Sequence, residues 1–510
     1  MTPKKLMMIC CMLSAAALAA GGAWAAEKQA APASPPISEA TQACLDCHSL
    51  ATPGIVADWK KSRMAKRTPA MGLKAPEMER RITAKAADIP REWLDVAVGC
   101  AECHTLRAEK HPATFDHEGF QVHTVVSPED CATCHTQERR EFGQNLMAHA
   151  RGNLINNPVY MDLADHVNAV VKVTGGKAAY LKPTPGDEAE SCLYCHGTEI
   201  KADGQRVINN PAMGEVTVTK LSGWPNRGVG RKNPDGSLGS CTACHTRHQF
   251  SIAMARKPAA CAECHKGPDV PAYKVYEVSE HGGIYRAMGG TWDFQALPWT
   301  VGRDFSAPTC AACHVSLLVS ADGAVLAKRS HRMNDRLWVR LIGLIYSHPH
   351  PKDPDTSKIK NAEGRSLATA LDGRPAASYL IDEKEQEARR ETMSKVCLAC
   401  HGTQWVDGQL RERLTASTAA ADAMVLAATR TMQEAWRKGL ATGPAKGGSP
   451  FDEYIEQLWT EQWLFHANSM RMASAMMGAD MGVFESGRWN LHKNLSHMRD
   501  WLQTRQDPAR

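Results

Sequence analysis

Sixteen of the 18 cysteines in this chain stand in eight copies of one pattern, Cys-x-x-Cys-His. The other two, Cys10 and Cys11, lie near the N-terminus, so a single chemical task accounts for every later cysteine. The eight motifs are Cys44-Cys47-His48, Cys100-Cys103-His104, Cys131-Cys134-His135, Cys192-Cys195-His196, Cys241-Cys244-His245, Cys261-Cys264-His265, Cys310-Cys313-His314 and Cys397-Cys400-His401.

The motif joins two thiols and an imidazole within five residues, which is the arrangement that attaches haem c. The thiols add to the two vinyl groups of a haem, and the adjacent histidine reaches the iron as the proximal ligand. A zinc site does not need a histidine directly after the second cysteine. A disulfide framework would not place every cysteine in such a unit. The sequence therefore predicts eight covalently attached haem c groups.

A haem that only carries electrons takes a sixth ligand, usually His or Met, whereas a haem that reacts with a substrate keeps this position open. Thirteen histidines outside the motifs can supply such ligands. His248 follows His245 too closely to bind the same iron from the opposite face, so we expect it to bind a neighbouring haem. The favoured ligands are His117, His123, His149, His248, His281 and His331, and further candidates are His348 and His350.

The elements that must position these sites fall into four segments. Residues 1–26 have the pattern of a secretory signal, because Lys4 and Lys5 precede an apolar stretch that ends in Ala-Trp-Ala. A transmembrane anchor is the alternative. We expect a flexible leader over residues 27–43, an octahaem-binding domain over 44–405 and a helical region over 406–510. The haem-binding loops are rich in Gly and Pro, which predicts short helices and turns wrapped on porphyrin.

Long helices are expected after the last motif. Between residues 411 and 440, apolar residues recur at Val425, Ala428, Met432 and Trp436, a helical spacing. Residues 443–450 break the pattern, and further helices are expected over 452–477 and 489–503. We interpret them as a packing and oligomerisation layer; a separate cofactor site is the alternative. The expected fold class is mainly α, a multihaem cytochrome c fold with a haem-packed core and long C-terminal helices.

The formal charge of +5 does not indicate a nucleic-acid partner. Each haem adds two propionates and a ferric core of about +1, so eight oxidised haems contribute roughly −8 and bring the holoprotein near neutrality. Beyond the signal, no run of about 18 apolar residues indicates a membrane span. The expected location is an oxidising compartment, most simply a bacterial periplasm.

From about Cys44 to Trp489, the chain resembles the octahaem hydroxylamine oxidoreductase family. The most specific stretch is Cys241-Thr-Ala-Cys-His-Thr-Arg-His248-Gln-Phe-Ser251, followed by Cys261-Ala-Glu-Cys-His265-Lys-Gly-Pro-Asp269. Ser279-Glu-His281-Gly also fits, as does the seventh motif with the following His331 and Arg336-Leu-Trp338. The resemblance implies a mainly α-helical, haem-packed fold that is often a trimer.

On this resemblance, the fourth motif holds the catalytic haem, with His196 as proximal ligand and an open distal side. The other seven haems then conduct electrons. Asp269 is the expected proton relay, and His166 and Tyr285 are further candidates. No motif reads Cys-x-x-Cys-Lys, which argues against relatives whose catalytic haem is bound by lysine, including several nitrite and tetrathionate reductases.

Three positions depart from the family pattern. Met481 or Phe484 stands where hydroxylamine-oxidising members have a tyrosine cross-linked to the catalytic haem. Val270 follows Asp269 where a distal histidine is usual. Met64 takes the place of a ligand histidine; a thioether ligand raises the haem potential, although Met64 can also be a packing residue.

Without the cross-link, we expect reduction rather than oxidation. The leading hypothesis is a periplasmic oxidoreductase acting on a small nitrogen compound such as hydroxylamine or nitrite. Its redox partner would be a cytochrome or a quinone-linked cytochrome. One alternative is a non-catalytic electron-transfer cytochrome in which all eight haems are six-coordinate. Another is the reduction of sulfur oxyanions.

Overall fold

The computed structural model describes residues 34–210, 214–476 and 481–506 of the 510-residue chain. The predicted signal, residues 1–26, lies outside this part. Residues Pro35–Arg510 form one compact unit, which contains both the predicted haem-binding region and the predicted C-terminal region. Helices are the main elements of this unit, so the predicted mainly α class is confirmed.

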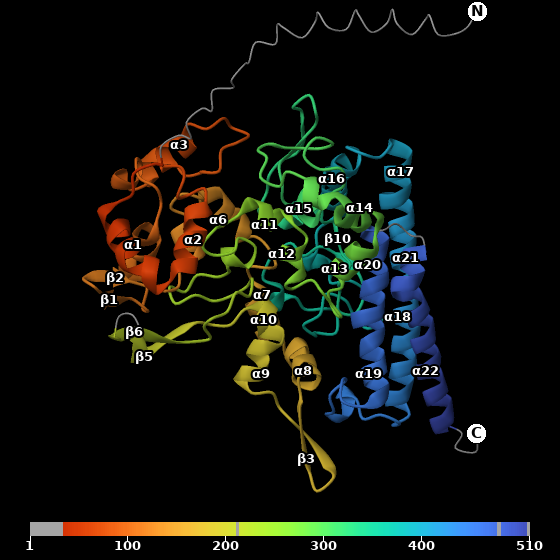
Figure 1. The fold of residues 1–510 in the computed structure, drawn as a ribbon. Coiled ribbons are helices and arrows are strands. Elements are labelled where there is room, and N and C mark those ends of the chain that lie inside the picture. Colours follow the sequence, from red (N-terminus) through yellow and green to blue (C-terminus); the bar gives the residue numbers. More distant parts are fainter. Residues whose placement is uncertain (1–33, 211–213, 477–480, 507–510) are drawn as a thin grey trace, which may run out of the picture. The chain divides into compact units, whose positions relative to one another are not determined.

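The N-terminal part begins with two helices that pack against each other, α1 (Glu39–Ala51) and α2 (Pro53–Lys61) (Figure 1). The Ser38 hydroxyl accepts a hydrogen bond from the Thr41 N–H and so caps the start of α1. Pro53 cannot continue a helix and instead opens the first turn of α2. The helices that follow are α3 (Pro69–Leu73), α4 (Cys100–His104), α5 (Pro128–Cys131) and α6 (Thr136–Phe142).

The middle of the chain consists of short helices joined by loops, as predicted for a region that wraps porphyrins. The longest of them, α8, has 10 residues. These helices are α7 (Ala150–Ile155), α8 (Pro158–Val167), α9 (Pro185–Glu190), α10 (Cys192–His196), α11 (Ile252–Arg256), α12 (Ala259–Ala262), α13 (Ala272–Val278), α14 (Glu280–Met288) and α15 (Cys310–His314).

The strands form small separate sheets. β1 pairs with β2, β3 with β4, β5 with β6 and β10 with β11, each antiparallel, and β7, β8 and β9 form a three-stranded sheet. Their bounds are β1 (Phe115–His117), β2 (Phe120–Val122), β3 (Val170–Thr174), β4 (Lys177–Leu181), β5 (Lys201–Asn210), β6 (Gly214–Ser222), β7 (Trp299–Thr300), β8 (Leu318–Val319), β9 (Val325–Ala327), β10 (Val339–Arg340) and β11 (His348–Pro349).

Three of the attachment motifs fold as helices of their own, namely α4, α10 and α15. In each of them the first cysteine is residue i, the second is i+3 and the histidine is i+4. Residues with these spacings share one face of a helix, so a single turn presents both thiols and the imidazole on the same side. The local fold thus places the three groups where one haem can take them all.

The C-terminal part contains the long helices, as predicted. α18 and α20 pack together and both contact α22 or the turn before it, and Figure 1 shows these helices side by side. Val425, Ala428 and Met432, which predicted the buried face of α18, have no exposed surface. The helices are α16 (Glu383–Cys397), α17 (Thr403–Asp407), α18 (Leu414–Arg437), α19 (Tyr454–Glu461), α20 (Asn468–Met476), α21 (Met481–Val483) and α22 (Trp489–Gln506).

The largest apolar core lies within these C-terminal helices. Around the attachment motifs, the apolar clusters are smaller: one consists of Leu45, Val56 and Trp59, with Cys100 among the residues packed against it. Large porphyrin faces would add the apolar surface that these small clusters lack. Among the described residues, no helix combines the length and apolar character needed to cross a membrane.

Candidate haem-binding sites

Four motif histidines face a second histidine ring from another part of the chain; we name each site after its motif histidine. The ring centroids of His48 and His117 are 6.1 Å apart. The same spacing, between 6.1 and 6.4 Å, recurs in the pairs His104–His248, His245–His331 and His401–His281. A second ring, that of His123, also lies 6.3 Å from His104.

This spacing fits an iron bound between two rings. Each metal–nitrogen bond is about 2 Å long and each nitrogen lies about 1 Å from its ring centre, so two axial imidazoles have centroids about 6 Å apart. The residues present therefore fit a haem at these sites. The geometry brings together four of the six ligands favoured from the sequence, and it sets His248 opposite His104, a neighbouring site, rather than opposite its own motif histidine.

The second ring nitrogen of several motif histidines is bound to the backbone. Nδ1 of His104 hydrogen bonds to the carbonyl of His123, and Nδ1 of His135 to the carbonyl of Arg81, both at 2.8 Å. Because a carbonyl only accepts, Nδ1 carries the proton in these bonds and Nε2 keeps the lone pair that binds a metal. Burial lowers the pKa of both histidines, which favours the neutral imidazole that a metal requires.

His348 and His350 have the same ring arrangement. Their exposures are 5% and 3%. Each Nδ1 donates to the carbonyl of the following proline, Pro349 at 2.7 Å and Pro351 at 3.0 Å. Burial lowers the pKa of both rings to about 3, so both are neutral. The structure therefore favours these two as ligands more strongly than the sequence did. The available signal was the His-Pro-His-Pro order, which places a carbonyl acceptor directly after each ring.

Met64 lies half-buried in the turn that follows α2. The adjacent Arg63 is close enough to Arg81 to lower its pKa by charge repulsion, after the larger effect of burial. The carbonyl of Arg81 in turn accepts the hydrogen bond from His135. The segment that carries Met64 therefore runs near Arg81, and the thioether ligand stays a prediction.

Two other predicted residues make local hydrogen bonds. Nε2 of His149 lies 3.0 Å from the Gly143 carbonyl, so the nitrogen that usually binds iron is already engaged. His166, on α8, donates from Nδ1 to the Asp162 carbonyl at 2.8 Å and also lies 3.3 Å from the Asp162 carboxylate. The Ser449 hydroxyl is 3.5 Å from the same nitrogen. His166 is thus held by its own helix and by the C-terminal part.

Tyr285 lies beside the seventh motif rather than the fourth. Burial raises its pKa, and Cys310 raises it further by proximity. With Tyr276 and Tyr273 it lines a cavity of about 390 Å³ that also contacts Lys257. The structure therefore does not bring Tyr285 to His196, where the sequence had suggested a role in a substrate pocket.

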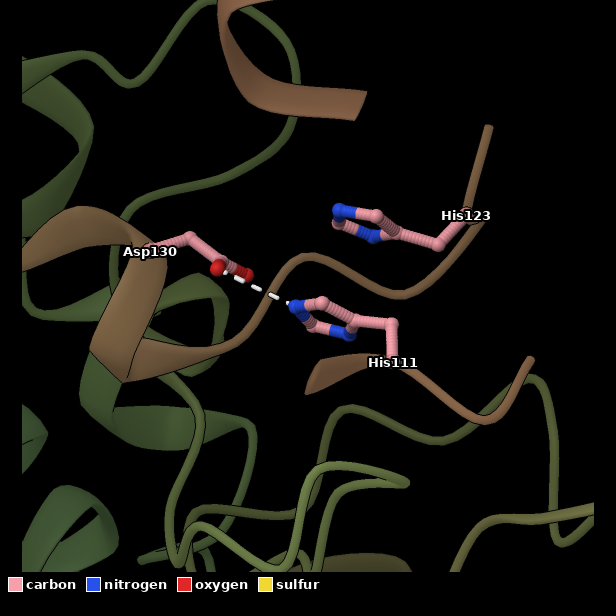
Figure 2. Close-up of side chains that lie close together, drawn as sticks. All are labelled: His111, His123 and Asp130. Atoms are coloured by element: carbon pink, nitrogen blue, oxygen red, sulfur yellow. Dashed lines mark hydrogen bonds and ion pairs between the residues drawn. The ribbon is translucent and has the colours of Figure 1, made fainter. Parts of the chain in front are cut away.

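Figure 2 shows a buried cluster of His111, His123 and Asp130, whose nitrogen and oxygen atoms lie close together. The two imidazoles are stacked, with centroids 3.7 Å apart and planes within 5° of parallel. A metal lies in the plane of each imidazole that it binds, in line with the nitrogen lone pair. Parallel planes this far apart share no point, so the two rings cannot hold one ion between them.

His123 has a different environment from the one predicted for an iron ligand. Both of its ring nitrogens face carbonyl oxygens, that of Val125 at 3.1 Å and that of Leu106 at 2.9 Å. Its own carbonyl accepts the hydrogen bond from His104. The stacked His111 is in turn fixed by Asp130 at 3.1 Å. The cluster therefore positions the His104 ring through the backbone, and both ring nitrogens of His123 lie against carbonyl oxygens in this arrangement.

The fourth motif, on α10, has a distinct set of neighbours. Nδ1 of His196 donates to the Ala150 carbonyl at 3.0 Å, as in His104 and His135. The Asn168 amide lies 3.1 Å from the Cys192 sulfur. Asp269 interacts electrostatically with both His196 and Cys192. The two residues predicted to be catalytic are therefore neighbours in the fold.

A cation lies near this site, and a phenol lies near that cation. Arg340 is close enough to both His196 and Tyr160 to lower the pKa of each, although burial is the larger effect on both. Burial raises the pKa of Tyr160, so its hydroxyl stays protonated at neutral pH. In the part of the chain that the structure describes, no histidine ring stands opposite His196 at the spacing of the four pairs. Arg340 and Tyr160 could not be found from the sequence, because neither belongs to a motif.

Contacts between motif cysteines show which sites are neighbours. Cys131 hydrogen bonds with Cys241, so the third and fifth motifs meet. The thiol of Cys264 hydrogen bonds with Cys195, and that of Cys261 with Cys310. The sixth motif therefore contacts the fourth with one cysteine and the seventh with the other.

Weaker electrostatic contacts complete the series, and they join Cys44 with Cys100, Cys103 with Cys134, Cys244 with Cys261 and Cys313 with Cys397. The motifs thus follow one another in the order one, two, three, five, six, seven, eight, and the fourth branches from the sixth. Among the motif cysteines, Cys47 and Cys400 are exposed, while the others are partly covered. These two belong to the first and last motifs, at the two ends of the series.

Two family profiles match parts of the chain. The family described as "Seven times multi-haem cytochrome CxxCH" matches residues 215–330. The family "Cytochrome c554 and c-prime" matches residues 43–136. A curated relative, a probable nitrite reductase-hydroxylamine oxidoreductase fusion protein of Kuenenia stuttgartiensis, is 28% identical over 286 residues. The match covers 53% of this chain but only 25% of that relative, so the chain spans about a quarter of its length.

Solved structures match over nearly the whole chain. The reducing HAO-like protein complex of Kuenenia stuttgartiensis aligns with a TM-score of 0.60 at 20% identity, over 92% of this chain and 86% of that one, and so shares the fold. A structure titled "Hypothetical multiheme protein" aligns with a TM-score of 0.87 at 39% identity, over 94% of this chain and 98% of that chain. On this near-complete match and its own attachment motifs, the chain belongs to the multihaem c-type cytochromes with the hydroxylamine oxidoreductase-like fold.

Proposed function

We propose that this protein is a periplasmic oxidoreductase with eight covalently attached haems, which reduces a small nitrogen compound such as nitrite or hydroxylamine at the His196 site. The observation that carries the proposal is the environment of His196, where the Asp269 carboxylate and the Arg340 cation both act on the ring; the protonated phenol of Tyr160 lies near Arg340. A redox partner cytochrome or a quinone-linked cytochrome would supply the electrons.

When bound, a haem with an open sixth position supplies an iron that takes the substrate nitrogen and passes electrons to it. The chain's own residues then handle charge and protons. Arg340 attracts an anionic substrate, and the Asp269 carboxyl relays the protons that each N–O cleavage consumes. The Tyr160 hydroxyl is a second proton donor. The absence of a tyrosine at Met481 or Phe484 supports the reductive direction.

The electron-transfer cytochrome is the second candidate, and one observation favours it. His348 and His350 are buried, neutral and oriented like ligands, so the chain has more potential sixth ligands than the four facing pairs use. If every iron is six-coordinate, no site is open to a substrate.

The coordination of the His196 haem separates the two functions. For the enzyme, we expect a high-spin ferric signal in the resting protein and a spectral shift on adding hydroxylamine, nitrite or cyanide. The double variant Cys192→Ala, Cys195→Ala should carry seven haems and lose both signals. The matched control Cys397→Ala, Cys400→Ala also loses one haem but should keep them. A wholly low-spin wild-type protein that ignores these ligands would support the electron-transfer cytochrome instead.

Turnover with a reduced viologen as electron donor then tests the substrate class and the role of Asp269 as a general acid. Hydroxylamine or nitrite should be reduced faster than tetrathionate or sulfite; the reverse order would favour sulfur-oxyanion reduction. Asp269→Asn should lower the turnover number by about 10²–10⁴, the usual contribution of a general acid, and should leave the high-spin signal unchanged. Asp88→Asn, at an exposed position far along the chain, is the control and should have wild-type turnover.

A further inference from the structure

The two ends of the haem series differ in their surroundings. At the first end, Cys47 lies on α1, followed by Leu50, which is 83% exposed, and by Ile55 on α2, which is 45% exposed. Exposed apolar side chains beside an exposed attachment cysteine leave a site that another protein can approach closely. Small apolar patches of this kind are typical of transient contacts between redox proteins.

Directly after this patch, the chain becomes strongly basic. Between residues 58 and 74 it has six Lys or Arg residues and a single acid, Asp58, which pairs with Lys61 at 3.2 Å. All six basic residues are exposed: Lys60, Lys61, Arg63, Lys66, Arg67 and Lys74. In the part of the chain that the structure describes, Lys60, Lys66 and Arg67 form no ion pair. Their charge is therefore available to a partner.

Packing ties this basic segment to the first two sites. Trp59 and Ala65 belong to the cluster that includes Leu45, the residue after Cys44, and that packs against Cys100. Asp58 also acts electrostatically on His248, the ring opposite His104. The basic side chains therefore border the His48 and His104 sites, at the start of the haem series.

The other end has no such imbalance. The segment 383–413, which contains the eighth motif, has six acidic and six basic residues. Several of them neutralise one another, as in the ion pairs that Glu387 forms with Arg390 and Arg411. Trp405 and Leu398 are exposed near Cys400, but nothing there selects the charge of a partner.

We propose that α1, α2 and the basic segment 60–74 form a docking surface for a small acidic protein that carries single electrons. In the transfer, one electron leaves the reduced carrier, which is oxidised by one electron, and reaches the iron of the His48 site, which changes from ferric to ferrous. No bond forms or breaks. Opposite charges steer such encounters and raise association rates by about 10- to 1,000-fold at low salt. High salt screens the charges and removes most of this gain. The proposal holds whether or not the His196 site is catalytic.

The test uses the full-length haem-loaded protein and flavodoxin, a small acidic flavoprotein, as the probe. Reduced flavodoxin is mixed with the oxidised protein in a stopped-flow instrument, and the second-order rate of haem reduction is followed from low to high salt. For the wild type, we expect the rate constant to fall by roughly 10-fold or more as salt screens the attraction. The triple variant Lys60→Gln, Lys66→Gln, Arg67→Gln should lose about 10-fold at low salt and most of the salt dependence.

The matched control is Lys384→Gln, Lys395→Gln, Arg413→Gln, three exposed basic residues near the eighth motif. It removes the same charge and should stay within about 2-fold of the wild type. Binding of oxidised flavodoxin, measured by flavin fluorescence anisotropy, should weaken only in the first variant. Both variants should react at the wild-type rate with an uncharged dye.

Three results would overturn the proposal. Equal losses in both triple variants would mean that net charge, not this surface, attracts the probe. An unchanged rate and binding in the first variant would show that its lysines and arginine do not contact the carrier. A changed haem content or changed midpoint potentials in that variant, with the uncharged dye slowed as well, would show that these side chains serve the haem propionates instead.

Discussion

A histidine that binds iron must turn one ring nitrogen to the metal and give the other a hydrogen-bond partner. His135 meets this rule through the Arg81 carbonyl, and His350 through the carbonyl of Pro351, whereas both nitrogens of His123 face carbonyls. The sequence supplied the candidate rings. It could not supply their orientation, because a partner such as Arg81 is distant along the chain. This is why the sequence could propose His123 and His149 as ligands without showing that their ring nitrogens face carbonyls.

Replacing a paired ring should open one iron. In His248→Ala, we expect the His104 haem to change from low-spin to high-spin ferric, because the opposing ring 6.3 Å away is removed. Electron paramagnetic resonance and the haem-to-protein ratio measure this, and the ratio should not change. His149→Ala is the control, since its Nε2 already bonds to Gly143, and it should keep the wild-type spectrum. A low-spin spectrum in both variants would exclude His248 as a ligand.

The predicted role of Met64 as an iron ligand can be tested by measuring haem midpoint potentials. If its sulfur binds the His135 haem, Met64→His should lower one midpoint potential, because imidazole stabilises the ferric state more than a thioether does. A spectroelectrochemical titration resolves the change. Met71→His, at an exposed position on α3, should leave every potential unchanged. If Met64 only packs, its variant will give the same titration as this control.

At the scale of elements, apolar periodicity was a sufficient guide where a helix has one buried face. The breaks and starts of α18, α19 and α22 lie within a few residues of those expected. The hairpin of β3 and β4 was not expected, and its residues show why: all of Val170–Thr174 is exposed. A strand that is exposed to solvent on both faces does not need to alternate apolar and polar residues, so periodicity does not predict it.

Glu456 makes the C-terminal helices sensitive to pH. It is fully buried on α19 and accepts a hydrogen bond from Trp436 of α18 at 2.6 Å. Burial raises its pKa from 4.5 to about 7, a change worth on the order of 3 kcal/mol. Because the pKa is raised on folding, this stabilisation is complete below 4.5 and is lost as the pH rises through about 7.

Glu456→Gln should therefore flatten the pH dependence of stability between pH 4.5 and about pH 7, since an amide keeps the shape but cannot ionise. Urea unfolding followed by circular dichroism at several pH values provides the free energy of unfolding. Glu412→Gln, at an exposed position before α18, should retain the wild-type slope. A slope that persists in the Glu456 variant would assign it to another group.

At the scale of the whole molecule, the motifs in the sequence predicted how many sites there are but not their order in space. The third motif meets the fifth through Cys131 and Cys241, and the fourth is bypassed. Such skips arise from tertiary packing, which brings distant turns together. The sparse clusters around the motifs accord with the low aromatic content of the chain, which is 6%.

Folding should depend on the haems. We expect the mature chain made with a competent maturation system to have the intact mass of the polypeptide plus eight haems. The same chain made without haem attachment should lose its cooperative thermal transition, because the small clusters near the motifs cannot replace the porphyrin surface. Scanning calorimetry measures both. A haem-free chain that melts cooperatively at the holoprotein temperature would contradict this.

The position of the fourth motif affects the route of electron transfer through the molecule. Among the cysteine contacts of the described residues, it joins the series through the sixth motif. It is therefore a side branch, and an electron travelling from the first motif to the eighth does not have to visit it. An inhibitor that occupies the His196 site should therefore stop turnover while through-conduction continues. The branch also lets electrons accumulate on the other seven sites and reach a substrate in quick succession. A multi-electron reduction then does not have to wait for successive encounters with the redox partner.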